Sequence, residues 1–106
     1  MAKYLIKATY TSDGAKGLLK EGGSKRRAAA EQGIKSAGGK LEAFYFAFGK
    51  ADAFVIVEAP DHATVSAASL AISSSGAVRT ETVVLLTPEE IDTAAKKSVT
   101  YRAPGH

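Results

Sequence analysis

Four short segments of strand-like sequence constrain the fold of this chain most strongly. They span residues 3–10, 40–48, 52–59 and 77–86, and each is rich in β-branched or aromatic side chains. Helix-like stretches follow the first and the third segment, whereas only a Gly-Lys-Ala turn separates the second from the third. The order along the chain is therefore predicted to be strand, helix, strand, strand, helix, strand.

Two helices are predicted between these strands. A helix over residues 24–37 would have Ser24 as its N-terminal cap and would end at Gly38-Gly39. A second helix over residues 62–74 would follow Pro60 and take Asp61 as its cap. Its Ala-rich composition predicts close packing against a sheet.

The segments outside this pattern are short. Residues 15–23 are punctuated by glycine and indicate one helical turn at most, after a turn at 11–14. Thr87, Pro88 and Glu90 predict the start of a terminal helix that runs to about residue 97. We expect the remaining tail, 98–106, to be ordered only by contact with a neighbouring subunit, with Tyr101 as its anchor.

The predicted order is that of the ferredoxin-like fold, an α+β arrangement with a four-stranded antiparallel sheet, here with an extra C-terminal helix. A chain of 106 residues has the size of one domain. We therefore expect a single domain over residues 1–97, followed by the tail.

Several classes of function are disfavoured by composition. The chain has no cysteine, which excludes disulfides, thiolate nucleophiles and Cys-bound metals. It shows neither a signal peptide nor a membrane-length apolar run, so we expect a cytoplasmic protein without a membrane partner. The net charge is +3, but residues 1–40 carry nine basic and three acidic side chains. We expect no metal and no cofactor.

The sequence resembles the GYD domain family over residues 4 to about 92. The resemblance rests on residues 4–7, 14–19, 23–27, 38–49 and 76–80. It implies a small bacterial protein with a ferredoxin-like fold, near the dimeric α/β barrel proteins, and it implies no settled activity. The family is named for a Gly, an aromatic residue and an Asp at the central hairpin. Gly49 and Asp52 match, whereas Ala51 stands at the aromatic position.

Strand alternation assigns an apolar and charged set of side chains to the sheet face that helices do not cover. A patch of this size is rarely left in water, which predicts a homo-oligomer, at least a dimer, that covers the face. The same face could form a ligand pocket between subunits, and ion pairs around an apolar interface are the alternative interpretation. The candidate pocket residues are Lys7, Glu42, Phe44, Phe46, Asp52, Phe54, Glu58 and Arg79.

A second candidate site is the basic, glycine-rich start of the first long helix. Backbone N–H groups at a helix N-terminus bind anions, and cations nearby would add to this. A solvated basic turn is the alternative interpretation. The candidate anion-binding residues are Gly22, Gly23, Ser24, Lys25, Arg26 and Arg27.

Two functions fit these features. The first is a homo-oligomeric accessory or ligand-binding protein that takes a small anionic or aromatic ligand. The second is a cofactor-independent enzyme of the dimeric α/β barrel kind, acting on a small, partly apolar substrate between subunits. Neither His62 nor His106 suggests catalysis, and no catalytic residue is assigned, although a carboxylate pair such as Glu42 and Glu58 could act as acid and base. Nucleic acid is disfavoured because the aromatic strand lacks the basic, glycine-rich pattern of RNA-binding sheets.

Overall fold

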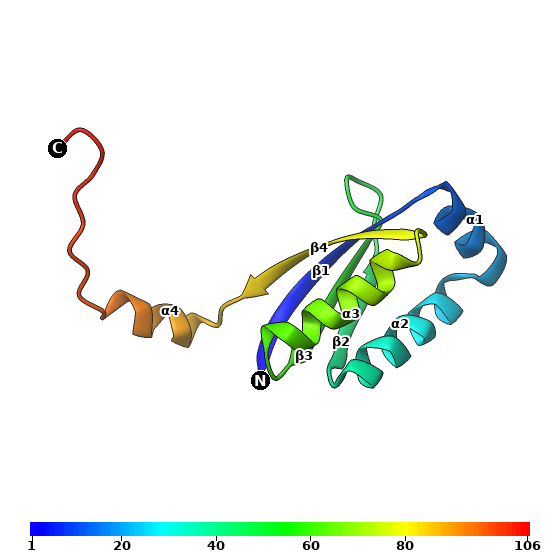
Figure 1. Cartoon of the computed structure of the whole chain (residues 1–106), viewed down its shortest axis with the longest axis horizontal. Helices are drawn as coiled ribbons and strands as arrows, with labels where there is room; N and C mark the ends of the chain where they lie inside the picture. The colour runs from blue at the N-terminus through cyan, green and yellow to red at the C-terminus, as the bar shows by residue number, and fades with distance from the viewer.

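A computed structural model describes residues 1–106 and has the predicted ferredoxin-like fold (Figure 1). The four strands form one antiparallel sheet in the order β2-β3-β1-β4. The elements are β1 (Ala2–Tyr10), α1 (Ser12–Glu21), α2 (Gly23–Ala37), β2 (Lys40–Phe46), β3 (Ala53–Ala59), α3 (His62–Ser74), β4 (Val78–Leu85) and α4 (Pro88–Ala95).

Helices α2 and α3 lie on one face of the sheet and bury its apolar side chains (Figure 1). Alternate residues of β1 and β3 point toward these helices and are buried, as strand geometry requires. The main core cluster consists of Tyr4, Ile6, Ile34, Leu41, Val55, Val57, Ala59 and Val65. The other face of the sheet carries no helix, and we call it the open face.

A β-bulge in β2 changes which of its side chains reach the open face. Leu41 pairs with Val57, but the next register pair is Ala43 with Ile56, so one extra residue enters the strand. Beyond the bulge, Phe44 pairs with Val55 and packs against the core. Strict alternation is therefore wrong for this strand.

The two phenylalanines of β2 consequently point to the helix-covered face, and the prediction that they lie on the open face is wrong. A Cβ on Gly23, the first residue of α2, would lie 2.9 Å from the Phe46 ring. The Phe44 and Phe46 rings meet edge to face at 5.2 Å. Tyr45, by contrast, pairs with Phe54 and lies on the open face.

The segment predicted as a single turn is a helix of ten residues, α1. Thr11 caps it, because its hydroxyl accepts a hydrogen bond from the N–H of Gly14. The prediction failed because the cap lies four residues before the expected start and because two glycines lower the helix propensity. Tertiary contacts outweigh that cost. The backbone N–H of Thr11 also binds the carbonyl of Ala77 at 3.0 Å.

Gly22 joins α1 to α2 and explains why the predicted cap at Ser24 is wrong. Its φ of 85° turns the chain between the two helices, and its N–H binds the carbonyl of Leu18. Helix α2 therefore starts at Gly23, with Ser24 already inside it and no side-chain cap. The predicted end of α2 is confirmed, since Gly38 is left-handed at φ 103°.

The caps of α3 and α4 are confirmed. Asp61 accepts hydrogen bonds from the N–H and the hydroxyl of Thr64, and these contacts hold the pKa of its carboxyl below the ordinary value. Thr87 and Glu90 form a capping box at the start of α4. None of the helices has the length and apolar character needed to cross a membrane.

Helix α4 and the residues after it extend away from the sheet (Figure 1). The longest extent of the molecule is 56 Å and the shortest is 22 Å. The predicted terminal helix is present as α4. It ends at Ala95, two residues before the end that the sequence predicts.

Candidate functional site

A cleft of about 430 Å³ lined by charged side chains lies beside α1 and the start of α2. We call it the basic cleft. Its floor comes from the end of β1 and the start of β4, and its walls come from the two helices. The lining residues are Tyr10, Asp13, Gly14, Gly17, Leu18, Lys20, Glu21, Lys25, Arg26, Ala77 and Val78.

Three cations and two acids face this cleft, but none of them forms an ion pair within 4 Å. Lys20 comes from the last turn of α1, whereas Lys25 and Arg26 come from the first turn of α2. Basic side chains at a helix N-terminus meet the positive end of the helix dipole, which does not favour them. An anion in the cleft would relieve this repulsion.

Tyr10 lies at the bottom of the cleft as the last residue of β1. Burial raises the pKa of its phenol, the nearby charge of Arg26 partly offsets this, and the carboxylate of Asp52 adds to it. Tyr10 therefore offers a neutral hydroxyl next to a guanidinium at ordinary pH. That pair could bind a carboxylate or phosphate oxygen.

Only part of the predicted anion-binding segment, residues 22–27, lines the basic cleft. Lys25 and Arg26 line the cleft, whereas Arg27 is exposed and lies outside its lining. Ser24 is exposed and is also absent from the lining. Gly22 and Gly23 shape the connection between the helices without lining the cleft.

Sequence reasoning missed the part of the cleft that comes from α1. Gly14 and Gly17 are spaced three residues apart and therefore share one face of a helix. A Cβ on Gly14 would lie 2.0 Å from the carbonyl oxygen of Ala77, so glycine is required for this close approach. The paired glycine spacing is the signal that could have identified this face, had residues 12–21 been interpreted as a helix.

An apolar hollow of about 340 Å³ shares two residues with the basic cleft. Tyr10 and Leu18 border both spaces. Phe46 and Phe48 are its other aromatic lining residues, and Phe48 is fully exposed. A ligand with an anionic group and an apolar group would find both kinds of surface near Tyr10.

The open face carries an apolar row across all four strands. Val83 pairs with Leu5, Leu5 with Ile56, and Ile56 with Ala43. Tyr45 and Phe54 lie beside this row and are 70% and 37% exposed. The prediction of an apolar patch on this face is therefore confirmed, although its aromatic members differ from those expected.

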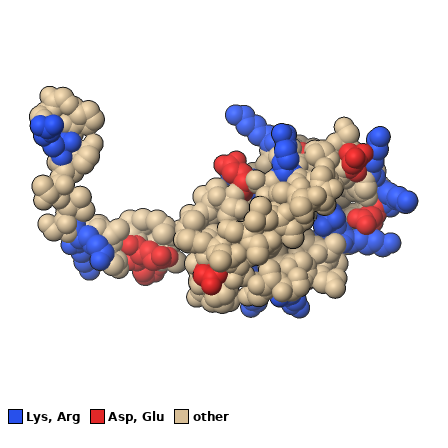
Figure 2. Space-filling view, in the orientation of Figure 1, with Lys and Arg blue, Asp and Glu red and all other residues tan.

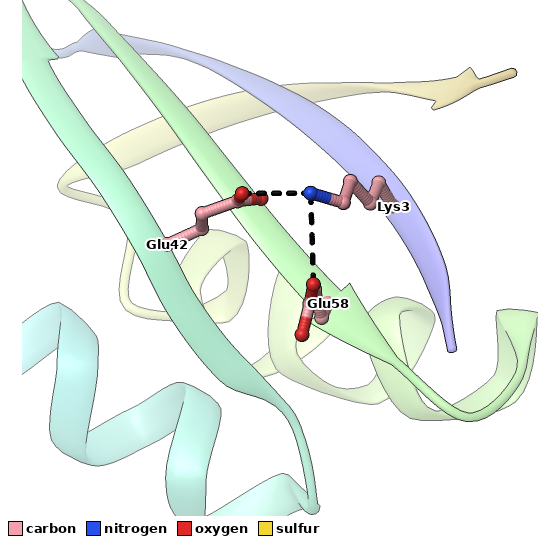
Figure 3. Close-up of polar contacts among 3 residues, drawn as sticks. All are labelled: Lys3, Glu42 and Glu58. Carbon is pink, nitrogen blue, oxygen red and sulfur yellow. Dashed lines mark hydrogen bonds and ion pairs between the residues drawn. The ribbon is translucent and has the colours of Figure 1, made fainter. Parts of the chain in front are cut away.

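One end of the open face holds an ion cluster centred on Lys3 (Figure 3). The ammonium of Lys3 lies 2.7 Å from the carboxylate of Glu42 and 3.6 Å from that of Glu58. The hydrogen bond to Glu42, together with the two negative charges, raises the pKa of Lys3, and desolvation partly offsets this. Glu42 is the extra residue of the bulge in β2.

The candidate pocket residues do not surround one cavity in the single subunit. Lys7 and Arg79 border a hollow at the far end of the open face from the Lys3 cluster. Phe54 pairs with Lys7 at that end of the face, whereas Glu42 and Glu58 bind Lys3 at the other. Phe44, Phe46 and Asp52 lie outside this face or at its margin, with Asp52 bound to Tyr10.

A comparison with protein families matches residues 4–95 to the model of the GYD domain. The chain belongs to the GYD domain family. The match covers all four helices and the whole sheet except the first two residues of β1. No curated protein sequence and no solved structure matches the chain.

The hairpin of this GYD domain connects the sheet to the cleft. The side chain of Asp52 accepts a hydrogen bond from the N–H of Tyr10, so it reaches across to β1 instead of closing its own turn. Ala51 is buried at the position where the resemblance implies an aromatic ring. Nothing lies within 4 Å of a Cβ built on Gly49, which faces open space.

The histidines of this GYD domain lie away from the cleft. His62 binds the hydroxyl of the buried Tyr4 through Nδ1 at 2.6 Å, which gives it a structural role. His106 is exposed at the end of the tail. The chain brings together no group of three or more His, Cys, Asp or Glu side chains that could hold a metal ion.

Proposed function

We propose that this GYD protein binds a small anionic molecule in the basic cleft and acts as an accessory or ligand-binding protein. One observation supports this proposal most strongly. Three cations, Lys20, Lys25 and Arg26, line a cleft of about 430 Å³, and none of them forms an ion pair with a carboxylate. Unpaired cations around a concave surface attract an anionic ligand and exclude a cationic one.

The chemistry of the cleft favours an anion that also carries an apolar or aromatic group. The neutral hydroxyl of Tyr10 and the guanidinium of Arg26 could share one oxygen of a carboxylate or phosphate. Leu18 and the rings of the neighbouring apolar hollow would contact the remainder of the ligand. A site with a few polar groups beside apolar walls is typical of small-molecule binding.

Thermal unfolding with added anions tests this proposal. Inorganic phosphate should raise the melting temperature of the native protein, and benzoate should raise it further at equal concentration, because a ligand that binds the native state stabilises it. The double substitution Lys25→Ala/Arg26→Ala should abolish both responses. Arg27→Ala is the matched control, since Arg27 belongs to the same helical turn but lies outside the cleft. Equal responses in all three proteins would overturn the proposal.

The proposal includes self-assembly through the open face. Its apolar row and the exposed rings of Tyr45 and Phe54 form a patch that a monomer rarely leaves in water. A second copy of the chain presents the same surface, so a two-fold arrangement would cover both patches at once. The occupant is therefore proposed to be another subunit.

The enzymatic alternative has less support from the geometry. Glu42 and Glu58, the carboxylates considered for acid–base chemistry, both lie within 4 Å of the ammonium of Lys3, and these ion pairs support a structural role for them. We also propose that the protein is cytoplasmic and bacterial, on the basis of its composition and of the family resemblance.

A further inference from the structure

The C-terminal arm, residues 86–106, is exposed along its whole length. No hydrogen bond or ion pair joins residues 87–106 to the rest of the chain. The Cα radius of gyration is 16.9 Å, whereas a compact chain of this length has about 13 Å. The arm therefore contributes no packing to its own subunit.

Helix α4 nevertheless has the features of an element that packs on a surface. It has a complete capping box and Pro at its start, yet eight residues are too few for a stable isolated helix. Ile91, Ala94 and Ala95 are spaced to form one narrow apolar stripe. Val99 and Tyr101 add exposed apolar surface further along.

The first half of α4 is also acidic. Figure 2 shows acidic side chains gathered on the arm, close to where it leaves the main body of the molecule. Glu90 is engaged in the capping box, so Glu89 and Asp92, three residues apart on one side of the helix, are the free acids. A partner surface for α4 should therefore be basic with a small apolar contact.

The open face has such a surface at one end, a hollow of about 370 Å³. Three cations and one carboxylate border it, and no ion pair within 4 Å engages any of them. The buried Ala51 supplies a small apolar contact. We call this the hairpin hollow, and its main lining residues are Lys7, Thr9, Lys50, Ala51, Arg79 and Glu81.

In the structure the arm does not reach the hairpin hollow of its own subunit (Figure 1). Arg79 lies at the start of β4 and Leu85 at its end, about 20 Å apart along an extended strand. Only two residues separate Leu85 from the start of α4, so the backbone of Glu89 stays within roughly 13 Å of the strand end. The free acids and the hollow are at opposite ends of the open face.

We infer that α4 of one subunit docks into the hairpin hollow of a second copy of the chain. This inference rests on the proposed self-assembly, and it adds α4 as the helix that stabilises the dimer. When two open faces meet with their strands antiparallel, the end of β4 in one subunit lies over the start of β4 in the other. Glu89 and Asp92 then approach Lys50 and Arg79, while the apolar stripe covers Ala51.

A cross-linking experiment tests this contact directly, because the chain contains no natural cysteine. Asp92→Cys protein is mixed with Lys50→Cys protein under mild oxidation, and a disulfide-linked pair should appear on a non-reducing gel. The control mixes Asp92→Cys with Lys35→Cys, since Lys35 is exposed on α2, on the helix-covered side. Equal cross-linking in both mixtures would overturn the inference.

A charge reversal in the full chain gives an independent test. Glu89→Lys/Asp92→Lys should raise the dimer Kd by about tenfold or more, and mixing this protein with Lys50→Glu/Arg79→Glu protein should restore association. If the native protein is a monomer, self-assembly itself is overturned. If the native protein is a dimer whose Kd is unchanged by the reversal, only the docking of α4 is overturned.

Discussion

The carboxylate of Asp52 accepts a hydrogen bond of 2.8 Å from the backbone N–H of Tyr10. The N–H of Asp52 in turn binds the carbonyl of Ala8, so this one residue extends the pairing with β1 just before the start of β3. Without this contact, the last N–H of β1 would lack a partner at a half-buried position. The hairpin Asp of the family thus holds the strand end that carries Tyr10 into the basic cleft.

Asp52→Ala should therefore lower the free energy of unfolding by about 1–2 kcal/mol, because it leaves the Tyr10 N–H without an acceptor. Asp52→Asn keeps an acceptor oxygen and should cost less. Urea denaturation of the two variants checks this. Equal losses in both would mean that the charge of Asp52, and not its hydrogen bond, is what stabilises the hairpin.

Gly14→Ala should destabilise the protein by about 1–3 kcal/mol or more, because its Cβ would overlap the backbone carbonyl of Ala77. Gly17→Ala is the matched substitution in the same helix, where nothing lies within 4 Å of the added carbon. It should stabilise the protein by up to about 1 kcal/mol through better helix propensity. Thermal unfolding distinguishes the two, and equal effects would contradict the close approach of α1 to Ala77.

Ile56→Lys should convert the proposed dimer to a monomer, since it places a charge in the centre of the apolar row. Leu70→Lys is the control, because Leu70 is 71% exposed on α3, away from the open face. Sedimentation equilibrium at micromolar concentration gives the association state. Phe46→Lys is unsuitable for this purpose, since Phe46 contacts the start of α2 instead.

The raised pKa of Tyr10 predicts a loss of stability at alkaline pH. The folded protein keeps the phenolic proton at pH values where the unfolded chain, with a pKa near 10.0, has lost it. Stability is therefore complete below about pH 10 and falls as the pH rises through the raised pKa. A spectrophotometric titration of the native protein minus that of Tyr10→Phe isolates this group. A midpoint at or below 10 would contradict the burial of the phenol.

The local features of this fold were predictable because they depend on neighbours in sequence. Asp61, Thr87 and Gly38 end or begin helices through hydrogen bonds and backbone angles within a few residues. The alternation of β1 and β3 likewise follows from strand geometry alone. These signals were sufficient for the order of the elements and hence for the topology of the sheet.

Two predictions that matter for function were wrong, the alternation of β2 and the single helical turn in place of α1. In both places, contacts between distant segments outweighed local preference. The bulge at Glu42 is compatible with many sequences, and it places Phe44 in the core. Helix α1 contains glycines that local propensity disfavours, yet Gly14 is what allows the helix to approach Ala77.

The sequence by itself determined the strands, the main helices, the family and the apolar character of the open face. Only the tertiary structure decided which polar and charged side chains meet. Tyr10, Lys20 and Arg26 come from three different elements, and β1, α1 and α2 bring them to one cleft. Alternation specifies the direction of a side chain along one strand, but it does not specify the packing of a helix against that strand. The basic cleft and the hairpin hollow exist because of that packing.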